Sequence, residues 1–132
     1  MMNQYILLTI LFVVVFIFWT LIKNSSNAGV RIKPSDAKTR LDTEKGIILL
    51  DVRTKGEYLE KHIPKSTLIP VDILANEASK KLPNKNAEIM VYCKSGSRSG
   101  VAVKTLLKLG YTNIYNLGGI VGWPYETVSG DR

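Results

Sequence analysis

Cysteine and histidine are almost missing from this chain of 132 residues, which contains one of each. The single cysteine, Cys93, excludes a disulfide bond within the chain and suits a reducing compartment. The sequence has no internal repeat, no low-complexity segment and no basic motif interleaved with aromatic residues. We therefore do not expect nucleic acid as a partner. No lysine or arginine precedes Tyr5, whereas a secretory signal peptide carries such charges at its start.

An uncharged apolar run at residues 5–22 is the longest hydrophobic feature that the chain does have. As a helix, its eighteen residues would span about 27 Å, close to the bilayer hydrocarbon thickness of about 30 Å. The run predicts one transmembrane helix, with residues 1–29 as anchor and linker and residues 30–132 as a single small domain. The positive-inside rule places that domain in the cytoplasm, because basic residues follow the run: Lys23, Arg31, Lys33, Lys38 and Arg40.

A cleaved signal peptide is the alternative for the same segment, and the domain would then be exported. Ser26-Asn27-Ala28, followed by Gly29, has the small-residue pattern of a cleavage site. The apolar run is longer than the usual hydrophobic region of about 7 to 15 residues. We favour the membrane anchor for that reason, with a single-pass topology in the cell membrane.

Beyond residue 30, short apolar runs typical of strands alternate with segments typical of helices. Ser35 and Thr54 are candidate N-caps, and Gly110 suits the position just after a helix. Repeated β-α units predict an α/β fold with a mainly parallel sheet, whose ligands bind at the carboxyl ends of the strands. Strands are expected at residues 30–32, 47–50, 67–69, 88–92 and 113–116, and helices at 34–41, 55–61, 71–81 and 99–109.

Cys93 follows one of these strand runs and precedes a small, flexible segment that leads into a helix. In this arrangement, loop N–H groups and the helix dipole favour an anion. They would lower the pKa of the thiol from about 8.5 towards neutrality, which makes Cys93 a candidate nucleophile. A buried apolar filler is the alternative, but such a residue needs neither the glycine nor the arginine that follow. The candidate substrate-binding residues are Lys94, Ser95, Gly96, Ser97 and Arg98.

The two cations of this loop differ in what they offer an anionic substrate. Arg98 presents a planar fork suited to oxyanions, and Lys94 presents a flexible point charge. The hydroxyls of Ser95, Ser97 and Ser99 are further candidate donors, although these serines also suit a tight loop because they are small.

Asp51 and Arg53 are candidate supporting residues at the carboxyl end of the strand at 47–50. We expect Asp51 to accept backbone N–H bonds and Arg53 to pair with Glu57 or with the helix that opens there. A structural role is also expected for His62, because a nucleophile that is already ionised needs no general base.

Between about residue 31 and residue 126, six short motifs occur in a characteristic order: Asp51-Val52-Arg53, Glu57-Tyr58, His62-Ile63-Pro64, Ile69-Pro70, Cys93 to Ser99, and Leu117-Gly118-Gly119 followed by Trp123. Together they resemble a single-domain rhodanese, a sulfurtransferase. The resemblance implies a five-stranded, mostly parallel sheet with helices on both faces. It also implies a cysteine that carries sulfane sulfur as a persulfide, with the loop from Cys93 to Arg98 as its cradle. A membrane helix before a cytoplasmic rhodanese domain is also found in bacterial relatives.

The chain departs from the family pattern around His62. Relatives usually have glycine before this histidine and Gly-Ala after the proline, where this chain has Lys61 and Lys65-Ser66. If the backbone needs a positive φ there, lysine costs about 1 kcal/mol. Gly118-Gly119, in contrast, is expected to permit a turn with positive φ.

The expected function is sulfur transfer. The Cys93 thiolate would attack the outer sulfur of thiosulfate or of another persulfide donor, and a thiophilic acceptor would then take the sulfur. Small-molecule donors and acceptors are the expected partners, and a sulfur-carrier protein or a cysteine desulfurase is a further candidate. The hypothesis requires no cofactor and no metal ion.

Two other hypotheses stay open. A phosphatase-like or arsenate-reductase-like enzyme shares the arrangement of cysteine, loop and arginine. Those phosphatases place one residue more between the two than the four found here, and the shorter loop fits a sulfur atom better than a phosphoryl group. The third hypothesis is a non-catalytic, membrane-tethered module that binds a partner or senses redox state. Inactive relatives typically lack the cysteine, so Cys93 argues against it.

Overall fold

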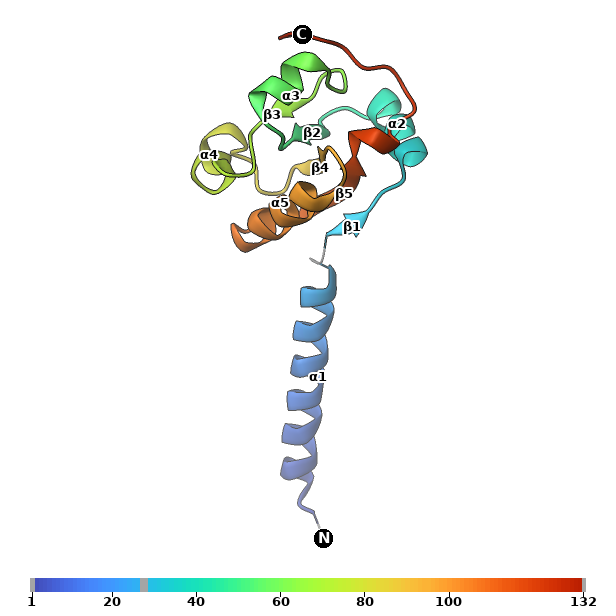
Figure 1. Ribbon diagram of the computed structural model, residues 1–132. Coiled ribbons are helices and arrows are strands. Elements are labelled where there is room, and N and C mark those ends of the chain that lie inside the picture. The colour runs from blue at the N-terminus through green and yellow to red at the C-terminus, as the bar shows by residue number, and fades with distance from the viewer. Residues whose placement is uncertain (1, 27–28, 132) are drawn as a thin grey trace.

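A parallel sheet forms the centre of the computed structural model (Figure 1), which describes residues 2–26 and 29–131. Its strands are β1 (Val30–Arg31), β2 (Ile48–Asp51), β3 (Thr67–Leu68), β4 (Glu88–Cys93) and β5 (Asn113–Gly119). They lie in the order β1-β5-β4-β2-β3, and every neighbouring pair is parallel. The predicted α/β fold with a five-stranded sheet is confirmed.

Helices cover both faces of this sheet (Figure 1). On one face, Leu74 and Leu106 pack with the strand residues Leu50 and Val91. On the other face, Ala37 packs with Leu49, Met90 and Ile120. The helices are α2 (Pro34–Thr43), α3 (Lys55–Glu60), α4 (Leu74–Lys81) and α5 (Ser97–Lys108), with a 3-10 turn η1 (Ile120–Gly122) after β5.

Strand β4 explains where the candidate site lies. It is placed between β5 and β2, and residues 89–93 are all buried, as is typical of a parallel strand covered on both faces. Its partner β2 pairs Asp51 with Tyr92. Cys93 and the segment after Asp51 therefore emerge side by side at the carboxyl edge of the sheet.

The helix ends test the predicted caps. Thr54 caps α3 as predicted, because its hydroxyl accepts from Glu57 N at 3.3 Å and the Glu57 carboxylate accepts from Thr54 N at 3.2 Å. Gly110, with φ 96°, follows α5 as predicted. The N-cap prediction for Ser35 is wrong. The cap position of α2 is Lys33, since the fixed φ of Pro34 suits the first turn of the helix.

Helix α1 (Gln4–Ser26) projects away from the sheet domain (Figure 1). Its segment Gln4–Leu21 is long and apolar enough to cross a membrane, and none of it is buried in the structure. A signal sequence near the N-terminus would have the same properties. The cleavage pattern Ser26-Asn27-Ala28 includes residues outside the described ranges, and the division of the chain at residues 29 and 30 stays a prediction.

Candidate active site

Cys93 is the last residue of β4 and is fully buried, with 0% of its surface exposed. The chain turns immediately after it and enters α5 at Ser97, two residues earlier than predicted. Gly96 makes this turn possible, because its φ of 108° lies in the left-handed region that glycine adopts without strain. The turn directs Gly96 N back to the sulfur, at 3.0 Å from Cys93 Sγ.

The surroundings of Sγ favour its ionised form. Burial raises the pKa of Cys93, but hydrogen bonds from the backbone N–H groups of Ser99, Gly96 and Arg98 and from the Ser99 hydroxyl outweigh it. The net effect is a pKa below the ordinary value, because donors to the charged form stabilise that form. The direction agrees with the prediction from the sequence.

Ser99 connects this loop to β5. Its buried hydroxyl lies 2.9 Å from Gly96 O and 2.9 Å from Asn116 Oδ1. Asn116 Oδ1 also accepts from Gly118 N at 2.9 Å. A hydroxyl has one proton, so Ser99 donates at any moment to one of these oxygens or to the Cys93 thiolate. The sequence singled out Ser99 only as one of three serines, and no local pattern identifies Asn116.

Two glycines at the end of β5, Gly118 and Gly119, lie next to the loop that follows Cys93. A Cβ atom on Gly119 would lie 2.2 Å from Lys94 O and 2.7 Å from Ser95 Cα. Gly118 has φ 85°, as predicted, but Gly119 has φ −112°. Gly119 is therefore required by the close approach of two backbones, and the prediction of a positive φ is wrong for it. Val121 N, just beyond, donates to Lys94 O at 3.2 Å.

Arg98 does not extend freely towards a substrate, because it forms a two-pronged ion pair with Glu57 of α3. The two N–O distances are 2.6 and 3.0 Å. Arg98 lowers the pKa of Glu57 to about 2, with a contribution from Thr54 at the cap of α3. Glu57 is thus not the partner of Arg53; of the two partners expected for Arg53, the structure has the helix, which Arg53 contacts through Lys61 O at its C-terminal cap. Lys94 is exposed, and its side chain has no ion pair within the described ranges.

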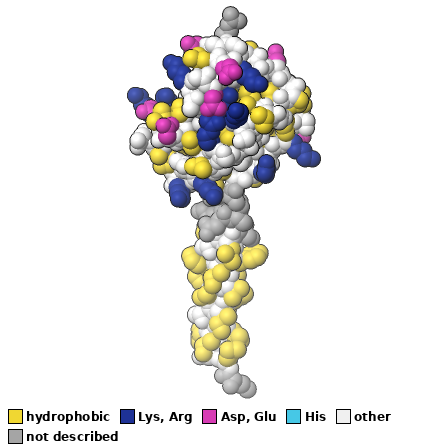
Figure 2. Space-filling view, viewed as in Figure 1, with side chains coloured by type: hydrophobic (Ala, Val, Ile, Leu, Met, Phe, Trp, Pro, Cys, Tyr) yellow, Lys and Arg dark blue, Asp and Glu magenta, His cyan; other side chains and the backbone are white. Residues whose placement is uncertain are grey.

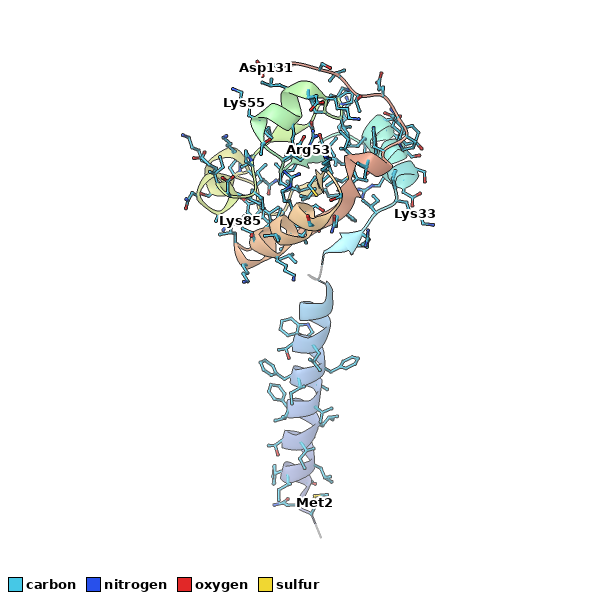
Figure 3. The ribbon with its side chains drawn as sticks, in the orientation of Figure 1. Met2, Lys33, Arg53, Lys55, Lys85 and Asp131 are labelled. Carbon is cyan, nitrogen blue, oxygen red and sulfur yellow. The ribbon has the colours of Figure 1, made fainter. Side chains whose placement is uncertain are left out.

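Arg53 lies inside the domain (Figure 3) and pairs with its near neighbour Asp51. Arg53 Nη2 lies 2.7 Å from Asp51 Oδ2, and these side chains are only 4% and 0% exposed. Asp51 also accepts from Arg53 N at 2.9 Å, as predicted. Arg53 Nη2 donates to Lys61 O at 2.8 Å, so the pair fixes the end of α3 to the edge of the sheet.

His62 has the structural setting that the sequence suggested. Its buried ring stacks on Tyr58 at 3.7 Å between centroids, and Nδ1 lies 2.8 Å from Tyr58 O. Of the two lysines that replace family glycines, Lys65 has a φ of 66°. Lys61 has a φ of −164° and is extended. The strain considered for lysine therefore applies to Lys65 alone.

Within residues 2–26 and 29–131, no group of three or more His, Cys, Asp or Glu side chains is arranged to hold a metal ion. A cavity of about 370 Å³ lies beside α2, between Lys38, Ile63 and Trp123, and no residue of the segment 93–99 lines it. The loop at Cys93 is thus the place where an activated group and anion-binding donors coincide.

The chain is similar to known proteins. The family model of the rhodanese-like domain matches residues 33–125. The thiosulfate sulfurtransferase PspE of Escherichia coli (strain K12) is 34% identical over 71 residues, which cover 54% of this chain and 68% of that protein. A sulfurtransferase of Allochromatium vinosum is 34% identical over 85 residues, covering 64% and 78%. The crystal structure of the Alr3790 protein from Anabaena sp. has a TM-score of 0.71 and 27% identity, covering 76% and 94%.

Proposed function

The chain belongs to the rhodanese-like domain family, and on that premise we propose that it is a sulfurtransferase that carries sulfane sulfur on Cys93. One observation carries the proposal. Cys93 Sγ lies at the end of β4, 3.0 Å from Gly96 N, among donors that lower the pKa of the thiol. A site of this kind stabilises both the attacking thiolate and the persulfide anion that forms from it.

The proposed reaction has two steps. In the first, the Cys93 thiolate attacks the outer sulfur of thiosulfate, the S–S bond of the donor breaks, and sulfite leaves with the electron pair. A persulfide donor would react in the same way and release a thiolate. In the second step, a thiophilic acceptor attacks the outer sulfur of the Cys93 persulfide, and the cysteine thiolate is restored. Neither step needs a general base, because the nucleophile is already ionised.

The loop residues have distinct roles in this proposal. The N–H groups of Gly96, Arg98 and Ser99 stabilise charge on the sulfur. Lys94 is the exposed cation that attracts the anionic donor. Ser95 and Ser97 have small side chains that allow the loop to turn tightly around the substrate. Arg98 orders the loop through its pairing with Glu57.

Two features support sulfur transfer over phosphoryl transfer. Four residues separate Cys93 from Arg98, one fewer than in the phosphatases with the same arrangement. In addition, both nitrogens of the Arg98 fork are engaged by Glu57. Asp51 and Arg53 have supporting roles beside the loop.

Thiosulfate or a persulfide is the proposed donor, and a low-molecular-weight thiol or a sulfur-carrier protein is the proposed acceptor. A cysteine desulfurase is a further candidate as the source of the sulfur. We also propose that α1 anchors the domain at the cytoplasmic side of the membrane, which would place the site among reduced thiols.

Mass spectrometry of the full chain after treatment with thiosulfate tests the reaction. We expect a gain of one sulfur atom, reversed by cyanide or dithiothreitol and missing in Cys93→Ser. An unchanged mass together with hydrolysis of a phosphate ester would refute sulfur transfer and favour the phosphatase hypothesis.

The location needs a separate test because Cys93 is buried. A Lys55→Cys variant in the Cys93→Ser background offers an exposed thiol. A membrane-impermeant thiol reagent should leave it unlabelled in intact cells and label it after permeabilisation. Labelling of intact cells would place the domain outside.

A further inference from the structure

The outer face of α5 carries positive charge without negative charge. The helix contains no aspartate or glutamate. Val101, Lys104 and Lys108 are exposed, and their spacing of three and four residues places them on one side of the helix. Like charges one turn apart disfavour a helix, so an anionic surface that neutralised Lys104 and Lys108 would stabilise this helix.

This face lies close to the point where the chain enters the domain. A Cβ atom on Gly29 would lie 2.4 Å from Val103 Cγ1 and 3.9 Å from Leu107 Cδ1. Residue 29 therefore contacts one turn of α5, and Lys104 and Lys108 are the next residues after those two contacts.

The distance from α1 to this contact is short. Helix α1 ends at Ser26, and three residue steps to Gly29 can cover at most about 11 Å. The apolar segment ends at Leu21, and the rest of α1 adds about 7.5 Å of helix. The headgroup region on each side of a bilayer is about 5 to 8 Å thick. In a chain anchored by α1, the contact between Gly29 and α5 thus lies no more than about 10 to 14 Å beyond the headgroups.

Basic side chains are found on the part of the domain that lies nearest α1. On the face shown in Figure 2, the charged side chains nearest α1 are Lys and Arg, whereas Asp and Glu side chains lie farther from α1, among other Lys and Arg side chains. Lys33 and Lys85 lie on the side nearest α1 in Figure 3, whereas Lys55 and Asp131 lie on the opposite side.

We propose that the outer face of α5 docks on the anionic headgroups of the membrane in which α1 is anchored. Lys104 and Lys108 provide electrostatic attraction to anionic lipids, and Val101 provides an apolar contact. The proposal rests on the anchoring function of α1 proposed above. Because α5 starts at the candidate sulfur-carrying loop, docking would fix the orientation of that loop relative to the membrane.

Fluorescence quenching in vesicles tests this contact. The full chain, with Cys93→Ser and Thr105→Cys, is labelled with a fluorophore at position 105 and reconstituted with a lipid that carries a quencher on its headgroup. Vesicles of phosphatidylcholine are compared with vesicles of equal parts phosphatidylcholine and phosphatidylglycerol. We expect stronger quenching in the anionic vesicles, and weaker quenching as salt is raised.

Two variants sharpen the test. Lys104→Gln with Lys108→Gln should lower the ratio of docked to undocked domain in anionic vesicles roughly thirty-fold, from the attraction of two lysines to the surface. Lys55→Gln with Lys80→Gln removes the same charge from two other helices and should leave the quenching unchanged.

The outcomes separate the two proposals. Vesicles that float with the protein but show equal quenching with and without anionic lipid would overturn the docking face and leave the anchor intact. Protein that does not float with the vesicles would overturn both. Neither result bears on sulfur transfer, which the mass measurement decides.

Discussion

Two segments at the same edge of the sheet each carry an arginine, and they use it in different ways. After β2, Arg53 pairs with Asp51 in the interior, with 4% and 0% of the side chains exposed. After β4, Arg98 pairs with Glu57 at the rim, with 32% and 27% exposed. A buried pair cannot open without leaving an uncompensated charge, whereas a rim pair exchanges with water and salt. We therefore expect the Asp51–Arg53 pair to contribute mainly to the stability of the fold. The Glu57–Arg98 pair can be lost at little cost in stability, and the segment that carries it forms the candidate active-site loop.

Replacing Asp51 should have the largest effect, and it tests whether the buried pair with Arg53 stabilises the fold. Asp51→Asn leaves the charge of Arg53 buried without its partner, so we expect the free energy of unfolding to fall by roughly 3 to 5 kcal/mol. Denaturant unfolding measures the change, and Asp42→Asn, at an exposed pair with Lys38, is the control. Sulfur uptake per folded molecule should stay intact. A selective loss of uptake without loss of stability would assign Asp51 to the chemistry instead.

Adding a side chain at position 119 should lower the rate of sulfur uptake, which tests the role of the loop after β4. In Gly119→Ala, the new Cβ atom meets Lys94 O and Ser95 Cα, so the loop must move away from β5. We expect the rate of sulfur uptake from thiosulfate to fall roughly a hundredfold, because a displacement of about 1 Å has that effect on reactive geometry. Gly122→Ala is the matched control, since nothing lies within 4 Å of its Cβ position. Equal rates in the two variants would show that this close packing does not matter for the site.

Loss of the Ser99 hydroxyl should have a smaller effect. Ser99→Ala removes a donor near the sulfur, so the pKa of Cys93 should rise and the uptake rate at neutral pH should fall about tenfold. A pH profile separates this from a structural defect, because the rate should recover as the pH is raised. Thr105→Ala removes a hydroxyl farther along α5 and should keep the profile of the unaltered protein. A loss that persists at high pH would contradict the electrostatic role.

The pair of Glu57 and Arg98 should contribute least to stability, and its contribution should depend on pH. The pKa of Glu57 is about 2 in the fold and about 4.3 in an unfolded chain, so the carboxylate stabilises the fold fully above the higher value. That contribution is lost as the pH falls from about 4.3 towards 2. Glu57→Gln should lower stability by at most about 1 kcal/mol at neutral pH, and its Tm should approach that of the unaltered protein in acid. A constant difference in Tm between pH 5 and pH 2 would refute this.

Local patterns were sufficient to predict much of the fold. Strand β4 is a mostly apolar run, Gly110 follows the end of α5, and Thr54 forms a capping box with Glu57. Each of these three signals extends over only a few residues. The carboxyl-edge position of Cys93 follows from the same alternation of strands and helices. Its catalytic role stays a proposal.

The supporting contacts of the site could not be predicted in this way. Asn116 reaches Ser99 from β5, Arg98 reaches Glu57 from another helix, and Gly119 contacts the loop through its backbone. Each contact depends on the order of strands in the sheet, which residue spacing does not encode. The expectation that Arg53 pairs with Glu57 was wrong for the same reason. Glu57 could pair with either Arg53 or Arg98, and only the positions of α3 and α5 decide between them.

The complete burial of Cys93 affects how the protein resists oxidation. Stepwise conversion of a thiolate to sulfinic acid requires contact with a dissolved oxidant. Because the unloaded sulfur is 0% exposed in the resting fold, an oxidant, like the sulfur donor itself, reaches it only when the loop moves. A second sulfur would extend the side chain outward by about 2 Å. The terminal atom would then be the first to meet solvent, so damage by peroxide should strike the loaded form before the empty one.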